Sequence, residues 1–192
     1  RVRGRGKLRN IKFQQIFLLL LLIPLSLSAR QGIHIPTANM INEKYSVQIE
    51  KSVAKYPYIN KSGAKVIMHP GLVKAVIYQE SRGVPDAKSH AGAYGLTQIM
   101  PQTAKLLKCD YNKLNSPELA IDCSVKFLAA LLTYNKGDLI KSLSGYNGGT
   151  HSTETKATTT EGLLAGRIYD HPETKQYVVS VLKWFEFFKT KK

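Results

Sequence analysis

The chain has 192 residues, a formal net charge of +15 at pH 7 and two cysteines. This length limits it to one ordinary domain with a leader, and no internal repeat is present. The basic charge suits nucleic acid, an anionic membrane or a polyanionic wall polymer as a partner. Nucleic acid is the weakest of the three, because no block of Lys and Arg is interleaved with aromatic residues and no helix-turn-helix signature is found.

Residues 1–29 differ from the rest of the chain. They contain six cations and no acidic residue, and an apolar run over residues 16–27 is broken by Pro24 and Ser26. The run is shorter than the ~20 residues of a membrane-spanning helix, and small residues follow it. We therefore expect a secretory signal peptide and a periplasmic protein. The alternative is an uncleaved segment that anchors the protein in the inner membrane.

The mature chain over residues 30–192 keeps a formal charge of +9 once those six cations are removed from +15. Its leader, residues 30–68, precedes a core expected at about residues 69–189. Residues 30–42 are expected to be irregular, residues 43–55 to form a helix with Val47, Ile49 and Val53 on its apolar face, and residues 56–68 to form a connection with Pro and Gly. No alternation is strong enough to predict a strand.

A helix that begins at Pro70 and ends before Gly83 and Pro85 places a carboxyl group at the end of an apolar face. Apolar residues recur in it at three- and four-residue spacing, and Glu80 is next on that face. These residues are Leu72, Val73, Val76 and Ile77. Partial burial and the negative end of the helix dipole favour a protonated carboxyl, which can donate a proton in glycoside cleavage. The alternative is an ordinary solvated glutamate.

A glycine-rich turn follows this helix. It contains Ser89, Gly92 and Gly95 and continues as Leu-Thr-Gln-Ile-Met-Pro to Pro101. Glycines allow a backbone to approach a ligand closely. The next helix is expected to begin near Gln102.

A long helix is predicted from Pro117, with Ser116 as its N-cap, and its wide apolar face indicates a central element of the core. A short helix over residues 138–143 is expected to lead into a turn that carries Tyr146 and Asn147 between glycines. That composition suits stacking on a sugar and hydrogen bonding to it. Residues 150–160 are rich in Thr and are expected to form a loop. The last helix is predicted over residues 173–189.

Cys109 and Cys123 lie in a chain that we expect to be exported. A disulfide between them would close a loop of about 15 residues and add on the order of 3 kcal/mol to stability. Two free buried thiols are the alternative, because cysteine usage does not fix geometry. The five histidines are scattered, with no spacing that gathers them with the cysteines around a cation, so no metal is expected.

Taken together, four separated blocks of the chain resemble the catalytic domain of the soluble lytic transglycosylase family, whose fold is similar to goose-type lysozyme. The resemblance spans about residues 72–181. The blocks are Glu80-Ser81; Ser89 with Gly92-Ala93, Gly95-Leu96, Gln98, Met100-Pro101 and Thr103-Ala104; Tyr146-Asn147-Gly148; and Pro172-Glu173-Thr174 with Tyr177-Val178.

The chain also departs from the family pattern. Gly83 and Val84 stand where an aromatic residue and Asn are usual, Thr97 replaces a usual Met, and Gly145 replaces a usual Ala. We expect Gly83 and Thr97 to change the shape of the sugar subsites.

The resemblance implies a mainly α-helical, lysozyme-like domain, compatible with a small β element near its cleft. It implies that Glu80 is the catalytic residue, acting as acid and then as base. It also places six residues around the substrate: Ser89, Gln98, Met100, Tyr146, Asn147 and Glu173. The implied reaction cleaves the β-1,4 bond between MurNAc and GlcNAc in peptidoglycan and leaves a 1,6-anhydroMurNAc end, without a cofactor. Core packing is the alternative role for Met100, and a turn cap for Asn147.

A count of carboxylates fits this mechanism. A hydrolysing glycosidase commonly needs two, and Glu80 has no obvious mate, since Asp86 is expected as a turn cap, Asp170 in a loop and Glu173 in the first turn of a helix. One acid suffices if the substrate supplies its own nucleophile. A lysozyme-type muramidase that uses water and an inactive wall-binding module remain as alternatives.

Two kinds of partner are expected. The first is the glycan strand of peptidoglycan. Small single-domain members of the family are often associated with envelope-spanning secretion, conjugation or pilus machines, so components of such a machine are the second, and nucleic acid is not expected.

Overall fold

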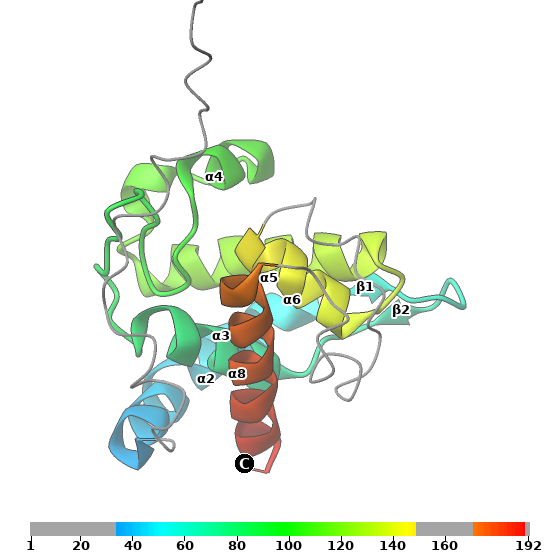
Figure 1. The fold of residues 1–192 in the computed structure, drawn as a ribbon, viewed down its shortest axis with the longest axis horizontal. Helices are drawn as coiled ribbons and strands as arrows, with labels where there is room; N and C mark the ends of the chain where they lie inside the picture. Colours follow the sequence, from blue (N-terminus) through cyan, green and yellow to red (C-terminus); the bar gives the residue numbers. More distant parts are fainter. Residues whose placement is uncertain (1–33, 149–170, 191–192) are drawn as a thin grey trace, which may run out of the picture. The chain divides into compact units, whose positions relative to one another are not determined.

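The computed structural model describes residues 34–148 and 171–190. The expected signal peptide and the Thr-rich segment at residues 150–160 lie outside these ranges. Within them the chain is mainly helical with one small hairpin, which confirms the predicted fold class (Figure 1). The elements are α2 (Ile35–Lys55), β1 (Tyr58–Ile59), β2 (Lys65–Val66), α3 (Pro70–Ser81), α4 (Pro101–Leu107), a 3-10 helix (Tyr111–Lys113), α5 (Pro117–Tyr134), α6 (Leu139–Gly148) and α8 (Pro172–Lys189). None of the described helices is both long and apolar enough to span a bilayer.

The helix α2 begins inside the segment that we expected to be irregular, so that expectation is wrong. His34 caps the helix by accepting a hydrogen bond from the Thr37 N–H at 3.4 Å, and Pro36 lies in the first turn, where its missing N–H costs nothing. A buried stripe at helical spacing then continues through the whole element. Its members are Ala38, Ile41, Tyr45, Ile49 and Val53, whereas Val47, predicted on the apolar face, is 82% exposed.

The connection between α2 and α3 contains an antiparallel hairpin, which no alternation in the sequence predicted, although the family resemblance allowed for a small β element. Tyr58 pairs with Val66 and Ile59 pairs with Lys65. The hairpin is joined to α5, because the Ile59 N–H donates to the Thr133 hydroxyl at 3.1 Å. Two-residue strands are too short to show an alternating pattern, so periodicity could not predict them.

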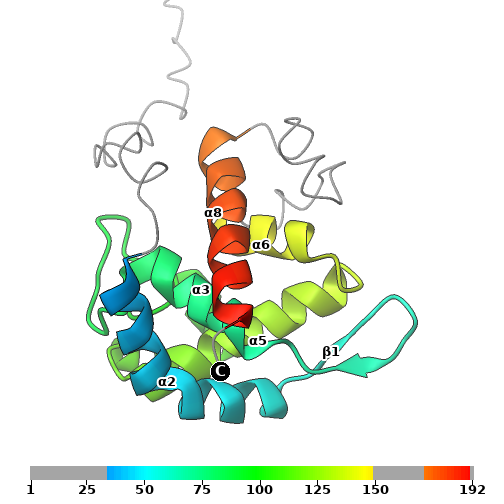
Figure 2. The same cartoon turned by 90° about the horizontal axis from the view of Figure 1, so that it is seen from below.

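The helix α3 is the central element, in contact with α2, α5 and α8 (Figure 2). Every residue from Gly71 to Tyr78 is buried. Other elements therefore surround this part of the helix on all sides. The prediction of a helix is confirmed, but the prediction that only one of its faces is buried is wrong. The helix from Pro117, α5, is a central core element as predicted, because Ile121, Val125 and Leu128 are fully buried and the helix contacts α2, α3, α4 and α6. The cover on α3 comes from distant segments, α2 and α8, whose placement local periodicity does not reveal.

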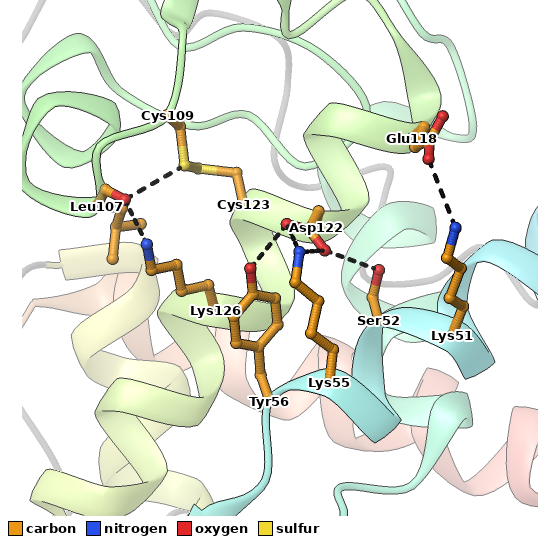
Figure 3. A network of polar contacts seen from close by, with 10 residues as sticks. All are labelled: Lys51, Ser52, Lys55, Tyr56, Leu107, Cys109, Glu118, Asp122, Cys123 and Lys126. Atoms are coloured by element: carbon orange, nitrogen blue, oxygen red, sulfur yellow. Dashed lines mark hydrogen bonds and ion pairs between the residues drawn. A yellow bond between two sulfur atoms is a disulfide. The ribbon is translucent and has the colours of Figure 1, made fainter.

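A polar network joins α5 to α2 (Figure 3). The Asp122 carboxylate accepts hydrogen bonds from Lys55 Nζ at 3.0 Å, from the Tyr56 hydroxyl at 2.8 Å and from the Ser52 hydroxyl at 3.4 Å. An exposed ion pair alone contributes little to stability. The additional hydroxyl donors satisfy most of the hydrogen-bonding capacity of the Asp122 carboxylate. The network therefore fixes α2 against this turn of α5.

The segment between α3 and α5 is supported by a second, smaller cluster of buried residues. These are Ile99, Ala104, Leu107, Leu114 and Cys123. A disulfide joins Cys109 to Cys123, with 6.1 Å between their Cα atoms, and ties the end of α4 to α5 (Figure 3). Lys126 Nζ also donates to the Leu107 carbonyl at 2.7 Å. A covalent bond and a polar contact thus hold this segment beside α5.

The helices α6 and α8 complete the domain. Because α6 extends to Gly148, Tyr146 and Asn147 lie in its last turns and not in the turn that we expected there. The helix α8 packs against α3 and α6, and Trp184 Nε1 donates to Gln79 Oε1 at 2.9 Å. Trp184 lies in the second half of α8, whereas Tyr177 in its first half contacts Glu80 at the C-terminal end of α3, where the chemistry is expected.

Candidate active site

Glu80 lies in the last turn of α3, partly shielded from solvent. Burial raises the pKa of its carboxyl group, a contact with the Tyr177 hydroxyl lowers it, and the Glu173 carboxylate raises it again, giving a pKa of about 8. Because about 8 lies above neutral pH, most of the Glu80 carboxyl is protonated at pH 7. Burial and a nearby anion together make Glu80 a proton donor.

Two tyrosines surround this carboxyl group. Burial is the main cause that raises the pKa of Tyr146 and of Tyr177, and the charge of Glu80 raises both further. The Tyr177 hydroxyl is buried and makes no well-formed hydrogen bond within the described residues. It nevertheless lies close enough to Glu80 to lower the pKa of that carboxyl. Tyr177 was predicted only as part of a motif, so its position beside Glu80 is a finding of the structure.

Tyr146 points its hydroxyl away from solvent and towards the glycine-rich loop. The hydroxyl donates to the Thr97 carbonyl oxygen at 2.9 Å and lies 3.1 Å from the Ser124 hydroxyl. The ring packs against Phe127, with 5.1 Å between the ring centroids. Because its single proton is bonded to Thr97, Tyr146 contributes its ring, rather than a free hydroxyl proton, to this region.

The loop that carries Gln98 is held by its own side chains. Gln98 has a φ of +49°, and its Nε2 donates to the carbonyls of Ala87 and Gly95 at 2.9 Å each. At Gly95, φ is +82° and a Cβ atom would lie 2.1 Å from the Leu114 carbonyl oxygen, so only glycine fits. The Gln98 amide N–H groups are therefore committed to the loop, and its Oε1 is the atom left to face a ligand.

The loop is also tied to the end of α3. The Ser81 hydroxyl donates to the Leu96 carbonyl at 2.7 Å and accepts from the Gly83 N–H at 3.1 Å. The residue next to Glu80 thus fixes the distance between the acid and the loop.

The remaining predicted site residues lie on the surrounding elements. The Ser89 hydroxyl accepts from the Ala93 N–H at 2.9 Å and closes a turn of the loop. Met100 is the N-cap residue of α4 and is partly buried. Asn147 is partly buried in α6, and Glu173 is exposed in the first turn of α8. Electrostatic coupling shows that Glu80, Tyr146, Tyr177 and Glu173 are close together, whereas Ser89 acts within the loop.

Both departures from the family pattern that we expected to alter the sugar subsites are buried. The Thr97 side chain is fully buried and its hydroxyl donates to the Ala120 carbonyl at 3.3 Å. A Cβ atom at Gly83 would lie 2.6 Å from Met40 Cε of α2. The flexible end of Met40 can move aside, whereas the φ of +82° at Gly83 strains any residue with a Cβ atom. Because Gly83 and Thr97 are buried, any effect of these residues on a ligand is indirect.

Other sites are less suited to this chemistry. Within the described residues no group of three or more His, Cys, Asp and Glu side chains could hold a metal ion. A surface cavity of about 670 Å³ is lined by Lys61, Lys136, Phe185 and neighbouring residues but not by Glu80. The titratable groups that point to catalysis are those at the end of α3.

Comparison with known proteins identifies related sequences. A family model described as "Transglycosylase SLT domain" matches residues 57–164. The peptidoglycan transglycosylase gp16 of Escherichia phage T7 is 42% identical over 84 residues, which are 41% of this chain and 6% of that protein. The transglycosylase of Enterobacteria phage PRD1 is 36% identical over 104 residues, 53% of this chain and 37% of that protein. The chain thus spans well under half the length of either relative.

Solved structures share the fold. An inactive mutant of the lytic transglycosylase Slt from Pseudomonas aeruginosa superposes with a TM-score of 0.63 at 20% identity, over 77% of this chain and 24% of that one. The 70 kDa soluble lytic transglycosylase of Escherichia coli gives a TM-score of 0.55 at 26% identity, over 78% and 25% of the two chains. The fold predicted from the motifs is confirmed. Since the family model covers more than half of its residues, this chain belongs to the transglycosylase SLT domain family.

Proposed function

We propose that this chain is a lytic transglycosylase that cleaves the β-1,4 bond between MurNAc and GlcNAc in peptidoglycan, with Glu80 as its catalytic residue. The observation that carries the proposal is the Glu80 carboxyl group, which is partly buried and has a pKa of about 8. Such a group can protonate a glycosidic oxygen at neutral pH. The names of the phage relatives, both transglycosylases and one acting on peptidoglycan, support the substrate class.

The proposed reaction uses one carboxyl group twice. Glu80 gives its proton to the oxygen between MurNAc C1 and GlcNAc C4, and the C1–O bond breaks with its electron pair remaining on that oxygen. The Glu80 carboxylate then accepts the proton of the MurNAc C6 hydroxyl while this hydroxyl oxygen bonds to C1. A 1,6-anhydro ring forms, no water is consumed, and Glu80 is protonated again for the next cycle.

The surrounding residues support this chemistry. The Gln98 Oε1 and the Tyr146 ring are the groups that we propose to orient the sugar, with Ser89, Met100 and Asn147 on the adjacent walls. Burial is the main cause that keeps the pKa of Glu80 high, and the Glu173 carboxylate adds to it. No step of the reaction as proposed requires a metal or an organic cofactor.

A lysozyme-type hydrolase is the second candidate, and the position of Glu173 is the observation in its favour. A second carboxylate near the acid could activate a water molecule. Glu173 is exposed in the first turn of α8. We prefer the transglycosylase because its reaction needs only the carboxyl group of Glu80.

The test is mass spectrometry of the soluble products that the purified protein releases from isolated peptidoglycan. Muropeptides that end in 1,6-anhydroMurNAc are expected, and Glu80→Gln should release none while remaining folded. Glu173→Gln should still give anhydro products. Reducing-end muropeptides, one water heavier, would instead support the hydrolase, and the absence of products from folded wild-type protein would favour a wall-binding module.

We further propose that the protein is exported and opens the wall locally beside an envelope-spanning machine. The basic and apolar composition of residues 1–29 and the Cys109–Cys123 disulfide, which is typical of oxidising compartments, support this location. Fractionation of cells that produce the full chain should place it in the periplasm or on the inner membrane. Recovery in the cytoplasm with free thiols would contradict the proposal.

A further inference from the structure

Three elements of the structure meet at the hydroxyl group of Tyr146. Tyr146 on α6 donates to the Thr97 carbonyl oxygen of the loop at 2.9 Å. A carbonyl can only accept, and a tyrosine hydroxyl has one proton, so the contact of 3.1 Å with Ser124 on α5 must be a bond that Ser124 donates. The directions of both hydroxyl groups are therefore fixed.

The loop is joined to the same part of α5 a second time. The Thr97 hydroxyl donates to the Ala120 carbonyl at 3.3 Å, one helical turn before Ser124. Thr97 and Ser124 are both fully buried. Thr97 directly precedes Gln98, and Tyr146 directly precedes Asn147. One turn of α5 thus bonds the side chains of Thr97 and Tyr146, which directly precede two predicted sugar contacts.

We propose that Ser124 is a positioning residue of the proposed site, which acts through Tyr146 to hold the Gln98 loop and the end of α6 in one arrangement. This inference rests on the proposed transglycosylase function. Ser124 is buried and does not face a ligand itself. Without its hydroxyl, the Tyr146 oxygen would lack its donor in a buried position, which is more costly than the loss of an exposed hydrogen bond. The loop and α6 would then separate from α5 to regain a partner.

The kinetic test measures kcat and KM on soluble, uncrosslinked peptidoglycan strands. In Ser124→Ala we expect KM to rise about fivefold, the equivalent of one hydrogen bond, while kcat changes little because Glu80 is untouched. A purely structural role would instead reduce the folded fraction, which lowers the apparent kcat and leaves KM unchanged. Ser52→Ala is the matched control, since it removes another buried serine hydroxyl, bonded to Asp122, and should leave KM as in the wild type.

A double-mutant cycle tests whether Ser124 acts through Tyr146. Tyr146→Phe removes the hydroxyl that Ser124 bonds, so Ser124→Ala should have no further effect on KM in that variant. If the KM increase in the double variant equalled the product of the increases in the two single variants, the inference would be overturned. An unchanged KM in Ser124→Ala, with active wild-type protein, would also overturn it.

Amide hydrogen exchange supplies a measurement that does not depend on activity. We expect faster exchange in residues 95–99 and 145–148 of Ser124→Ala than in wild type or Ser52→Ala. Unchanged exchange would overturn the positioning role. Wild-type protein that releases no products would overturn the proposed function, whereas active wild type with an unaltered Ser124→Ala would overturn this inference alone.

Discussion

The hydroxyl group of Tyr177 on α8 lies beside the carboxyl group of Glu80 at the end of α3, in a region shielded from solvent. This contact lowers the pKa of Glu80, whereas burial and the Glu173 carboxylate raise it. The two neighbours on α8 therefore act in opposite directions on the same acid. Each can be removed by a substitution that preserves the size of the side chain.

Replacing Tyr177 with Phe should move the pH dependence of activity upwards. The variant loses the contact that lowers the pKa of Glu80, so this pKa should rise above about 8. Activity depends on the protonated acid, so the decline of kcat/KM at high pH should begin at a higher pH. The measurement is a pH profile of kcat/KM on soluble glycan strands. Tyr56→Phe serves as the control, because it removes a hydroxyl bonded to Asp122. If the pH profiles of Tyr177→Phe and Tyr56→Phe were identical, the prediction would be contradicted.

Replacing Glu173 with Gln should have the opposite effect. Loss of the neighbouring anion lowers the pKa of Glu80, so the decline should begin at a lower pH than in the wild type. Because Glu173 is exposed, added salt should shift the wild-type profile in the same direction and leave that of the variant nearly unchanged. A profile that shifts upwards, or a salt effect of equal size in both proteins, would show that Glu173 does not act through its charge.

Glu80→Gln should stabilise the protein at neutral and higher pH. The unfolded state loses the Glu80 proton near pH 4.5 and the folded state near pH 8. The folded state binds more protons in this window, so the wild type loses stability as pH rises from about 4.5 to about 8. Since Glu80 keeps part of its surface in solvent, we expect the variant to gain on the order of 2 kcal/mol at pH 8 and almost nothing at pH 4.

Urea unfolding at both pH values measures this difference. A stability difference between Glu80→Gln and wild type that is the same at pH 4 and pH 8 would mean that the carboxyl group titrates alike in the folded and unfolded states. Glu186→Gln is a suitable control, because Glu186 is exposed and pairs with Lys189 on the surface of α8.

Loss of the disulfide should destabilise the protein by on the order of 3 kcal/mol, the value expected for a loop of about 15 residues. The variant Cys109→Ala/Cys123→Ala, or the reduced wild type, should show this loss in urea unfolding. Loss of the bond should speed hydrogen exchange more in the amides between α3 and α5 than in those of α3, because the disulfide ties only that segment to α5. Lys126→Met removes the neighbouring polar contact and should cost clearly less. Equal protection in oxidised and reduced protein would contradict the prediction.

Local signals predicted the parts of the fold that depend on neighbouring residues. Pro70 and Pro117 lie in the first turns of α3 and α5 as predicted, and Ser116 is the N-cap residue of α5, although its side chain makes no capping hydrogen bond. The position of Glu80 at the end of a buried helix also followed from spacing. Each of these features is determined within a few residues of the chain.

Features that depend on distant segments could not be predicted in this way. The contact between Tyr177 and Glu80 exists because α8 packs on α3, and the role of Thr97 depends on α5 and α6. Ser124 gave no signal, since a single serine in a predicted helix is ordinary. The motif resemblance placed several of these residues in one site, but it did not indicate that Gly83 and Thr97 are buried.

Three consecutive residues of α5 reach three different parts of the molecule. Asp122 bonds α2, Cys123 is linked to Cys109 beyond α4, and Ser124 bonds Tyr146 of α6. Successive residues of an α-helix are rotated by about 100°, so the helical phase at this point directs all three contacts together. Deletion of one residue earlier in α5 would turn every one of them towards a wrong partner. The domain should therefore tolerate substitutions along this helix much better than a change in its length.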